Sequence, residues 1–201
     1  MDNYHSSYNR LHCIQLPVLF RILYCCGTRI GETLGIRKKD IDLESGIIRL
    51  TETKNRKERY VTMGGELLAL ARRFADRTFY QIADDEYVFR NKNGGGLKYD
   101  TIKHIHREIL AMAGIPFVGN SHGPRIHDWR HTFAIRSFKH MSDNGTDMYV
   151  ALPILSTYLG HGTIMATEHY LRLTLEMFPE IEEKMGKTAE KVFGGIVYEG
   201  N

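Results

Sequence analysis

The fold class is set by the stretch IIRLTETKNRKERYVTM, residues 47–63. Branched and aromatic residues gather at its two ends, 47–50 and 60–63, and residues of this kind favour extended strands. Between them lies the polar, basic segment 53–57, which is typical of a turn that joins two paired strands. We therefore expect an antiparallel hairpin with a positively charged tip.

On both sides of this hairpin the apolar residues recur with the period of a helix. The predicted helices cover residues 15–26, 29–36, 66–75, 99–113, 127–141 and 150–159, and a last one starts near residue 163. Gly27 and Gly160 follow two of these helices, where glycine commonly ends a helix. The expected fold is mainly α with a small antiparallel β-hairpin or sheet near the N-terminal third, an α+β class.

Composition favours one folded domain. The chain has 201 residues, of which 42% are hydrophobic and 25% charged, and these fractions exclude a disordered or collagen-like protein. No apolar run approaches the roughly 20 residues that span a bilayer, and the first residues lack the layout of a secretory signal. We expect a cytoplasmic protein without a membrane partner.

Positive charge is concentrated in two blocks. Residues 1–63 carry a net charge of about +4, residues 90–139 about +6, and residues 176–201 about −3. Such blocks suggest a polyanionic partner, although a solvated surface is the ordinary alternative.

The segment His127-Asp128-Trp129-Arg130-His131 offers chemistry on a helix. At i and i+3, His127 and Arg130 share a helix face, so an imidazole and a guanidinium can converge on one ligand. By itself this pattern is also typical of two surface neighbours.

A second segment, Leu159-Gly160-His161-Gly162, precedes Tyr170. A continuous helix would place His161 and Tyr170 on opposite faces, so a shared site needs a break between them, which the glycines supply. The alternative is a loop histidine and a core tyrosine.

Two more positions carry cations. Arg29 stands in the first turn of the predicted helix 29–36, where Thr28 can provide the cap, and Lys54 stands at the hairpin tip. Singly, they are an ordinary helix-start arginine and an exposed turn lysine.

In this order and spacing the segments resemble the tyrosine recombinases, the family of the phage integrases and the Xer-type resolvases. The match runs from about Cys13 to Leu173. It assigns the catalytic set to positions that all hold the expected residue type: Arg29, Lys54, His127, Arg130, His161 and Tyr170. Trp129 replaces a usual leucine, Thr28 an apolar residue, and the segment between Arg130 and His161 is longer than in the Xer type.

The resemblance also implies a domain organisation. Residues 1–175 would be the tyrosine recombinase catalytic domain, and residues 176–201 a C-terminal tail that docks on a neighbouring protomer. The N-terminal core-binding domain, which clamps the other side of the DNA in the family, is expected to be absent.

The implied reaction is DNA strand exchange. Tyr170 would attack the scissile phosphate to give a 3′-phosphotyrosyl intermediate and a free 5′-hydroxyl, without metal, cofactor or ATP. Arg29, Arg130 and His161 would meet the phosphate charge, and His127 would serve as base. Lys54 would act as general acid on the leaving 5′ oxygen.

The implied partner is double-stranded DNA at an attachment site, bound by a homotetramer near the bacterial nucleoid during integration or excision of a phage or mobile element. Candidates for phosphate contacts are Arg37, Lys38, Arg56, Lys57, Arg59, Lys103 and Arg107.

Three alternatives stay open. A type IB topoisomerase or a telomere resolvase shares the nucleophile logic, and a non-catalytic DNA-binding module shares the fold. A zinc site built from His122, His127 and His131 is the third, although no cysteine or well-placed carboxylate completes it in the neighbouring sequence.

Overall fold

The computed structural model describes residues 10–51, 58–119, 122–161, 167, 170, 172, 174 and 176–179. The chain forms two compact units, and the division between them falls between Arg130 and His131. The predicted domain boundary at residue 175 stays a prediction.

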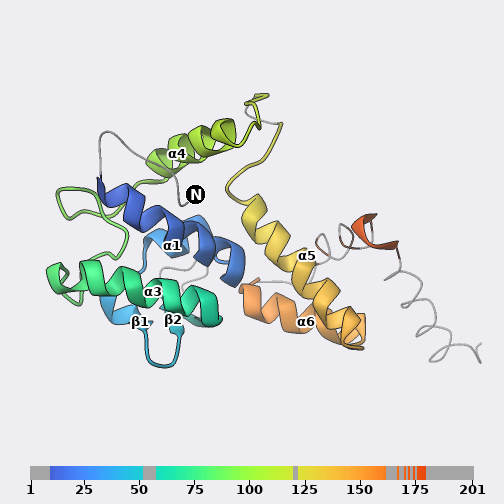
Figure 1. Cartoon of the computed structure of the whole chain (residues 1–201). Helices are drawn as coiled ribbons and strands as arrows, with labels where there is room; N and C mark the ends of the chain where they lie inside the picture. The colour runs from blue at the N-terminus through green and yellow to red at the C-terminus, as the bar shows by residue number, and fades with distance from the viewer. Residues whose placement is uncertain are drawn as a thin grey trace, which may run out of the picture. The chain divides into compact units, whose positions relative to one another are not determined.

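The first unit is built mainly from helices. They are α1 (Arg10–Cys26), α2 (Ile30–Leu34), α3 (Gly65–Thr78) and α4 (Tyr99–Met112), with the short 3-10 helices η1 (Lys38–Asp40) and η2 (Phe79–Gln81). Helices α1 and α3 pack against each other (Figure 1). Leu16, Leu19 and Leu23 of α1 are buried, as are Leu67 and Phe74 of α3. Their spacing of three, four or seven residues places the apolar side chains of each helix on one face, which explains the pairing.

A three-stranded antiparallel sheet completes the first unit. It contains β1 (Ile41–Asp42), β2 (Ile47–Leu50) and β3 (Arg59–Thr62), in the order β1-β2-β3. Ile48 lies opposite Ile41 on one side and Val61 on the other, and Ile48, Leu50 and Val61 are buried. The alternation of buried and less buried residues along β2 is that of a strand with one face on the core.

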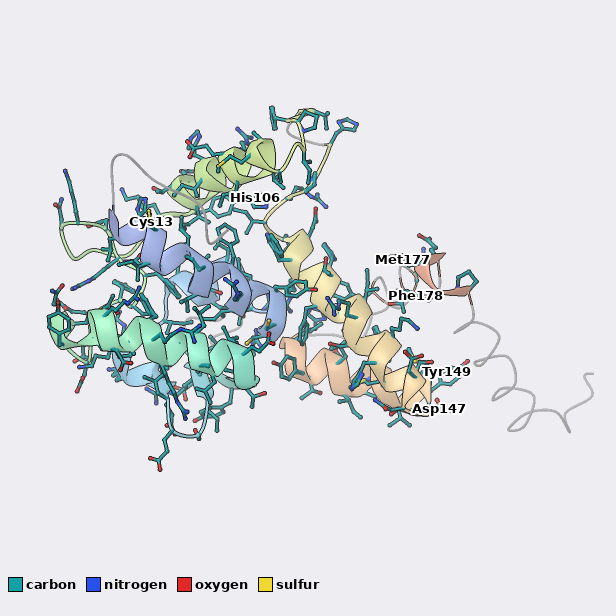
Figure 2. The ribbon with its side chains drawn as sticks, in the orientation of Figure 1. Cys13, His106, Asp147, Tyr149, Met177 and Phe178 are labelled. Atoms are coloured by element: carbon teal, nitrogen blue, oxygen red, sulfur yellow. The ribbon has the colours of Figure 1, made fainter. Side chains whose placement is uncertain are left out.

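The second unit contains most of α5 (Asp128–Asp143) and all of α6 (Met148–Leu159). Asp147 caps α6 by accepting a hydrogen bond from the Tyr149 backbone nitrogen at 2.7 Å, and both residues lie at the start of this helix (Figure 2). The helix ends at Gly160, whose φ of 65° is left-handed, a conformation that glycine adopts without steric cost. A buried cluster joins α5 and α6 through Ala134, Phe138, Ala151, Leu155 and Leu159.

The predicted mainly helical fold with a small antiparallel sheet is confirmed. Two elements differ from the prediction: α1 is longer, and β1 was not predicted. Helix α1 begins at Arg10, before the predicted start at residue 15. The sequence did not indicate this first part of the helix, because residues 11–14 are only half-buried and lie outside the apolar run that marks a core helix. Strand β1 pairs through only Ile41 and Asp42, too few residues for a periodic signal. None of the helices in the described ranges combines the length and hydropathy that crossing a bilayer requires.

Candidate active site

Arg29 lies where the chain enters α2. It is the residue that precedes the helix, with extended backbone angles, so it takes the place that we expected Thr28 to hold. The Thr28 hydroxyl instead forms a hydrogen bond with the Thr33 hydroxyl at 2.6 Å. The Arg29 side chain is 24% exposed, which keeps its guanidinium within reach of solvent at the edge of the first unit's core.

Glu32 holds Arg29 in this position. One carboxylate oxygen accepts a hydrogen bond from the Arg29 guanidinium at 2.7 Å, and the other accepts from the Arg29 backbone nitrogen at 2.8 Å. Glu32 also accepts from the Arg59 guanidinium at 2.6 Å. A carboxylate that bridges two guanidiniums fixes both of them, since charge-assisted hydrogen bonds are the strong ones.

The charge state of Glu32 follows from these contacts. Its side chain is only 1% exposed, and burial alone would raise the pKa of the carboxyl. The Arg59 guanidinium and the hydrogen bonds from Arg29 overcome that effect and hold the pKa of Glu32 below its ordinary value. The first unit therefore contains a buried, ionised carboxylate at the base of Arg29.

Arg130 reaches the same turn from α5. It is 1% exposed, and its guanidinium donates a hydrogen bond to the Gly27 backbone carbonyl at 2.7 Å. Gly27 stands two positions before Arg29. The first unit thus brings together the two chain segments in which the sequence analysis placed the phosphate-binding arginines.

His127 lies just before α5 rather than within it. Its backbone carbonyl accepts a hydrogen bond from the Arg130 backbone nitrogen at 3.0 Å, which closes the first turn. His127 is exposed whereas Arg130 is buried, so the common helix face that we expected gives two different environments. Asp128 fixes this turn by accepting from the Arg125 backbone nitrogen at 2.8 Å.

His161 and Tyr170 come together in the second unit. Their rings stack with centroids 5.5 Å apart and planes 10° from parallel, and the His131 ring lies 5.0 Å from Tyr170 on a tilted plane. Gly160 supplies the left-handed residue that breaks α6 before His161. His161 is held further by a hydrogen bond of 2.6 Å between its Nδ1 and the Thr167 hydroxyl.

Tyr170 is a core residue of this unit. It is 3% exposed and belongs to the cluster that contains Phe138 and Leu159. Burial of this kind is what the alternative of a core tyrosine anticipates.

The remaining catalytic candidate, Lys54, lies outside the described residues, as do the DNA-contact candidates Arg56 and Lys57. The flanking strands β2 and β3 are paired, and the pair nearest the predicted tip is Leu50 with Arg59. The two strands of the predicted hairpin are therefore present.

Among the other DNA-contact candidates, two are tied to the loop 82–87. The Arg37 guanidinium donates to the Asp85 carbonyl at 2.7 Å and lies 4.7 Å from the centre of the Tyr87 ring. Lys38 donates to the Ile82 carbonyl at 3.0 Å and pairs with Asp84 at 3.1 Å. These contacts give both side chains a structural role beside the predicted one.

Lys103 and Arg107 lie one helical turn apart on α4 and are half-buried. The Arg107 guanidinium lies 4.3 Å from the centre of the Phe117 ring. The α4 candidates thus form a basic strip on one helix.

Sequence reasoning missed two polar residues that support this site. Glu32 carries a usable signal, because an acidic residue at the third helical position after the start is typical of helix capping. His106 carries no such signal. It lies on α4 (Figure 2), is buried, and accepts a hydrogen bond from the Trp129 indole nitrogen.

The described part of the chain holds no cluster of three histidine, cysteine or acidic side chains that could bind a metal ion.

Comparison with known proteins places the chain. The model of the phage integrase family matches residues 2–177. The integrase/recombinase y4rB of Sinorhizobium fredii is 32% identical over 178 residues, 86% of this chain and 56% of that protein. The tyrosine recombinase XerC of Chlorobaculum parvum is 28% identical over 83% of this chain and 47% of its own length. The chain spans about half the length of these curated relatives.

Solved structures share the fold. The XerH site-specific recombinase bound to its difH substrate matches with a TM-score of 0.65 and 23% identity, over 84% of this chain and 45% of that one. The catalytic domain of bacteriophage HP1 integrase matches with a TM-score of 0.53 and 21% identity, over 100% of this chain and 90% of that one. With most of its length matched by the family model, the chain belongs to the phage integrase family of tyrosine recombinases, enzymes that break and rejoin DNA.

Proposed function

We propose that this chain is the catalytic domain of a site-specific DNA recombinase in which Tyr170 is the nucleophile. The observation that carries the proposal is the stacking of His161 on Tyr170 at 5.5 Å. These residues come from separate segments of the family pattern, and a shared site required the chain to turn between them. The family match over residues 2–177 supports the same assignment.

The reaction places extra negative charge on the non-bridging phosphate oxygens. Fixed cations stabilise that charge best when their orientation is set before the reaction. Arg29 is oriented by Glu32, and Arg130 by the Gly27 carbonyl. Guanidinium groups suit the task because they stay charged and donate to two oxygens at once. His161 would add a further donor.

Two groups would move the protons. As the bond forms between the Tyr170 hydroxyl oxygen and phosphorus, His127 would take the phenolic proton, since imidazole titrates near neutral pH. As the bond from phosphorus to the 5′ oxygen breaks, Lys54 would donate a proton to that oxygen. The 3′-phosphotyrosyl bond retains the energy of the phosphodiester, so a 5′-hydroxyl can attack it and rejoin the strands without metal or ATP.

Attack on DNA requires Tyr170 to leave its present surroundings. A side chain that is 3% exposed cannot approach a phosphate in line while it is packed against His131 and the α5–α6 cluster. The proposal therefore includes a movement of the segment around Tyr170 when DNA binds.

DNA binding would use the basic residues named above. Lys103 and Arg107 on α4 are among those that the described structure leaves accessible in part. The DNA would be an attachment site, and the biological role integration or excision of a phage or mobile element in the bacterial cytoplasm, at the nucleoid.

Assembly into a homotetramer on DNA is part of the proposal, with residues 176–201 docking on a neighbouring protomer. Helix α6 supports an interface between copies because it carries no charged residue. Three of its apolar side chains, Tyr149, Val150 and Ile154, are about half exposed or more. An uncharged exposed surface of this kind is typical of interfaces.

The test is trapping of the covalent intermediate. The protein would be incubated in EDTA with nicked duplexes tiled across the DNA that flanks its coding sequence, and the products separated on a denaturing gel. Wild-type protein is expected to form a DNA adduct, and Tyr170→Phe is expected to bind DNA and form none. The matched control is Tyr80→Phe, which removes an exposed tyrosine hydroxyl from η2 and should leave the adduct intact.

An adduct that persists in Tyr170→Phe would refute Tyr170 as the nucleophile. Relaxation of supercoiled DNA without exchanged strands would favour the topoisomerase alternative. DNA binding by the wild type with no adduct on any duplex would favour the non-catalytic module.

A further inference from the structure

Trp129 sits at the centre of an aromatic cluster in the first unit. It belongs to the first turn of α5, directly before Arg130. Its ring contacts Phe20 and Tyr24 of α1, with centroids 6.0 and 5.8 Å apart. His106 of α4 completes the cluster at 6.3 Å and stacks on Phe20 at 5.9 Å. Three helices therefore meet around one indole.

One directional bond lies inside this cluster. The Trp129 indole nitrogen donates a hydrogen bond to His106 Nε2 at 3.3 Å. An indole N–H can only donate, so His106 Nε2 must carry no proton and the imidazole must be neutral, with its proton on Nδ1. The burial of His106, which is 4% exposed, favours the neutral ring and lowers its pKa, although Asp128 opposes that effect.

The aromatic contacts favour certain angles between the ring planes, but they do not specify the direction in which the indole N–H points. A hydrogen bond to a buried acceptor on another helix fixes that direction. Since Trp129 and Arg130 are consecutive residues of one helical turn, an indole fixed in this way fixes the rotation of the turn about its axis. That rotation decides whether the Arg130 guanidinium meets the Gly27 carbonyl at 2.7 Å.

We propose that His106 is a positioning residue, which orients Arg130 for the scissile phosphate by accepting the Trp129 indole N–H. The inference rests on the proposed function, because it takes Arg130 as a phosphate-binding group. It gives Trp129 a specific role as the donor of the contact between α5 and α4.

The experiment uses the full chain and the nicked duplex that gives an adduct with the wild type. Two variants separate the hydrogen bond from ring volume: His106→Leu removes the acceptor, and His106→Gln restores an oxygen acceptor at the end of a side chain of similar length. His104→Leu is the matched control, because it removes an exposed histidine from the same helix. Thermal unfolding confirms that each variant is folded at the assay temperature.

At saturating DNA, His106→Leu is expected to form adduct roughly five- to tenfold more slowly, the range expected for loss of one buried hydrogen bond. DNA affinity should change less than twofold. His106→Gln should recover most of the rate, and His104→Leu should match the wild type. In a Trp129→Phe background the donor is already missing, so adding His106→Leu should slow the reaction no further.

Fluorescence gives a readout that does not depend on cleavage. Trp129 is the only tryptophan of the chain, so the emission spectrum reports on this indole alone. His106→Leu is expected to shift the emission maximum, whereas His106→Gln and His104→Leu should preserve it.

The outcomes separate the two proposals. If the wild type forms adduct and His106→Leu does so at the same rate, the positioning role is refuted and the proposed function stands. Equal impairment of the leucine and glutamine variants would assign His106 to packing and also overturn the inference. If the wild type forms no adduct on any duplex, the proposed function is refuted, and the positioning role, which rests on it, is refuted as well.

Discussion

Replacement of Glu32 by glutamine tests the ion cluster that orients Arg29. The carboxylate is 1% exposed and meets Arg59, itself only 10% exposed, at 2.6 Å. Glutamine keeps the shape and one acceptor oxygen but removes the charge that both guanidiniums face. Breaking a buried ion pair on one side costs about 3 to 5 kcal/mol. We expect the lower end, about 3 kcal/mol, because the amide oxygen still accepts one hydrogen bond and Arg29 is in part solvated.

The assay is urea unfolding at pH 7. With a slope of about 2 kcal/mol/M, a loss of about 3 kcal/mol lowers the midpoint by roughly 1.5 M. Glu44→Gln is the matched control, because Glu44 is exposed, and its midpoint should stay within about 0.3 M of the wild type.

The pH dependence of the unfolding free energy gives a second test of the same prediction. The pKa of Glu32 is held below its ordinary value in the folded protein, with burial opposed by Arg59 and Arg29. A depressed carboxyl pKa contributes stability above the unfolded pKa of about 4.3, and that stability is lost as the pH falls through the folded pKa. The difference between wild type and Glu32→Gln should therefore be full at neutral pH and shrink below about pH 4. A difference under about 0.5 kcal/mol at pH 7, or one that does not shrink in acid, would refute the reasoning.

Three further predictions follow from the described residues. Tyr170→Phe should lower the unfolding free energy by no more than about 1.5 kcal/mol, because the buried ring stays in place; Tyr170→Ala should cost about 3 to 5 kcal/mol in the same urea titration. Lys103→Ala should make the plot of log affinity for duplex DNA against log salt shallower by about 0.9, and an unchanged slope would remove Lys103 from the interface. Gly160→Ala should destabilise the chain by about 1 kcal/mol in thermal unfolding, because the left-handed φ of 65° strains a residue with a Cβ. The control is Gly31→Ala on α2, where a Cβ would meet open space, and it should show no such strain.

The sequence predicts the order and type of the main elements because their signals are local. The strands at 47–50 and 59–62 follow from branched and aromatic residues on either side of a polar turn, and the end of α6 follows from Gly160. Strand β1 was not foreseen, since the pairing of Ile41 with Ile48 depends on a partner rather than on a pattern of its own.

The candidate residues are equally visible in the sequence, but their surroundings are not. Spacing placed His127 and Arg130 on one helix face, yet His127 lies before α5 and is exposed while Arg130 is buried. The cause is the turn at Arg125–Asp128, which starts α5 one residue later than expected. Long-range partners such as the Gly27 carbonyl for Arg130 have no signature in local spacing.

These environments suggest how a recombinase can carry reactive groups without reacting. Arg29 is tied to Glu32, Arg130 to a backbone carbonyl, and Tyr170 is packed in the core of the second unit. The contacts of Arg130 and Tyr170 are ones that a DNA phosphate or a moving segment can replace, because a phosphate oxygen competes well for a guanidinium that already donates to a neutral carbonyl. The ion pair between Glu32 and Arg59 is different, since both of its groups are almost fully buried. We therefore expect DNA to exchange the partners of Arg130 and Tyr170 while Glu32 and Arg59 stay together, so that the base of Arg29 remains fixed through the reaction.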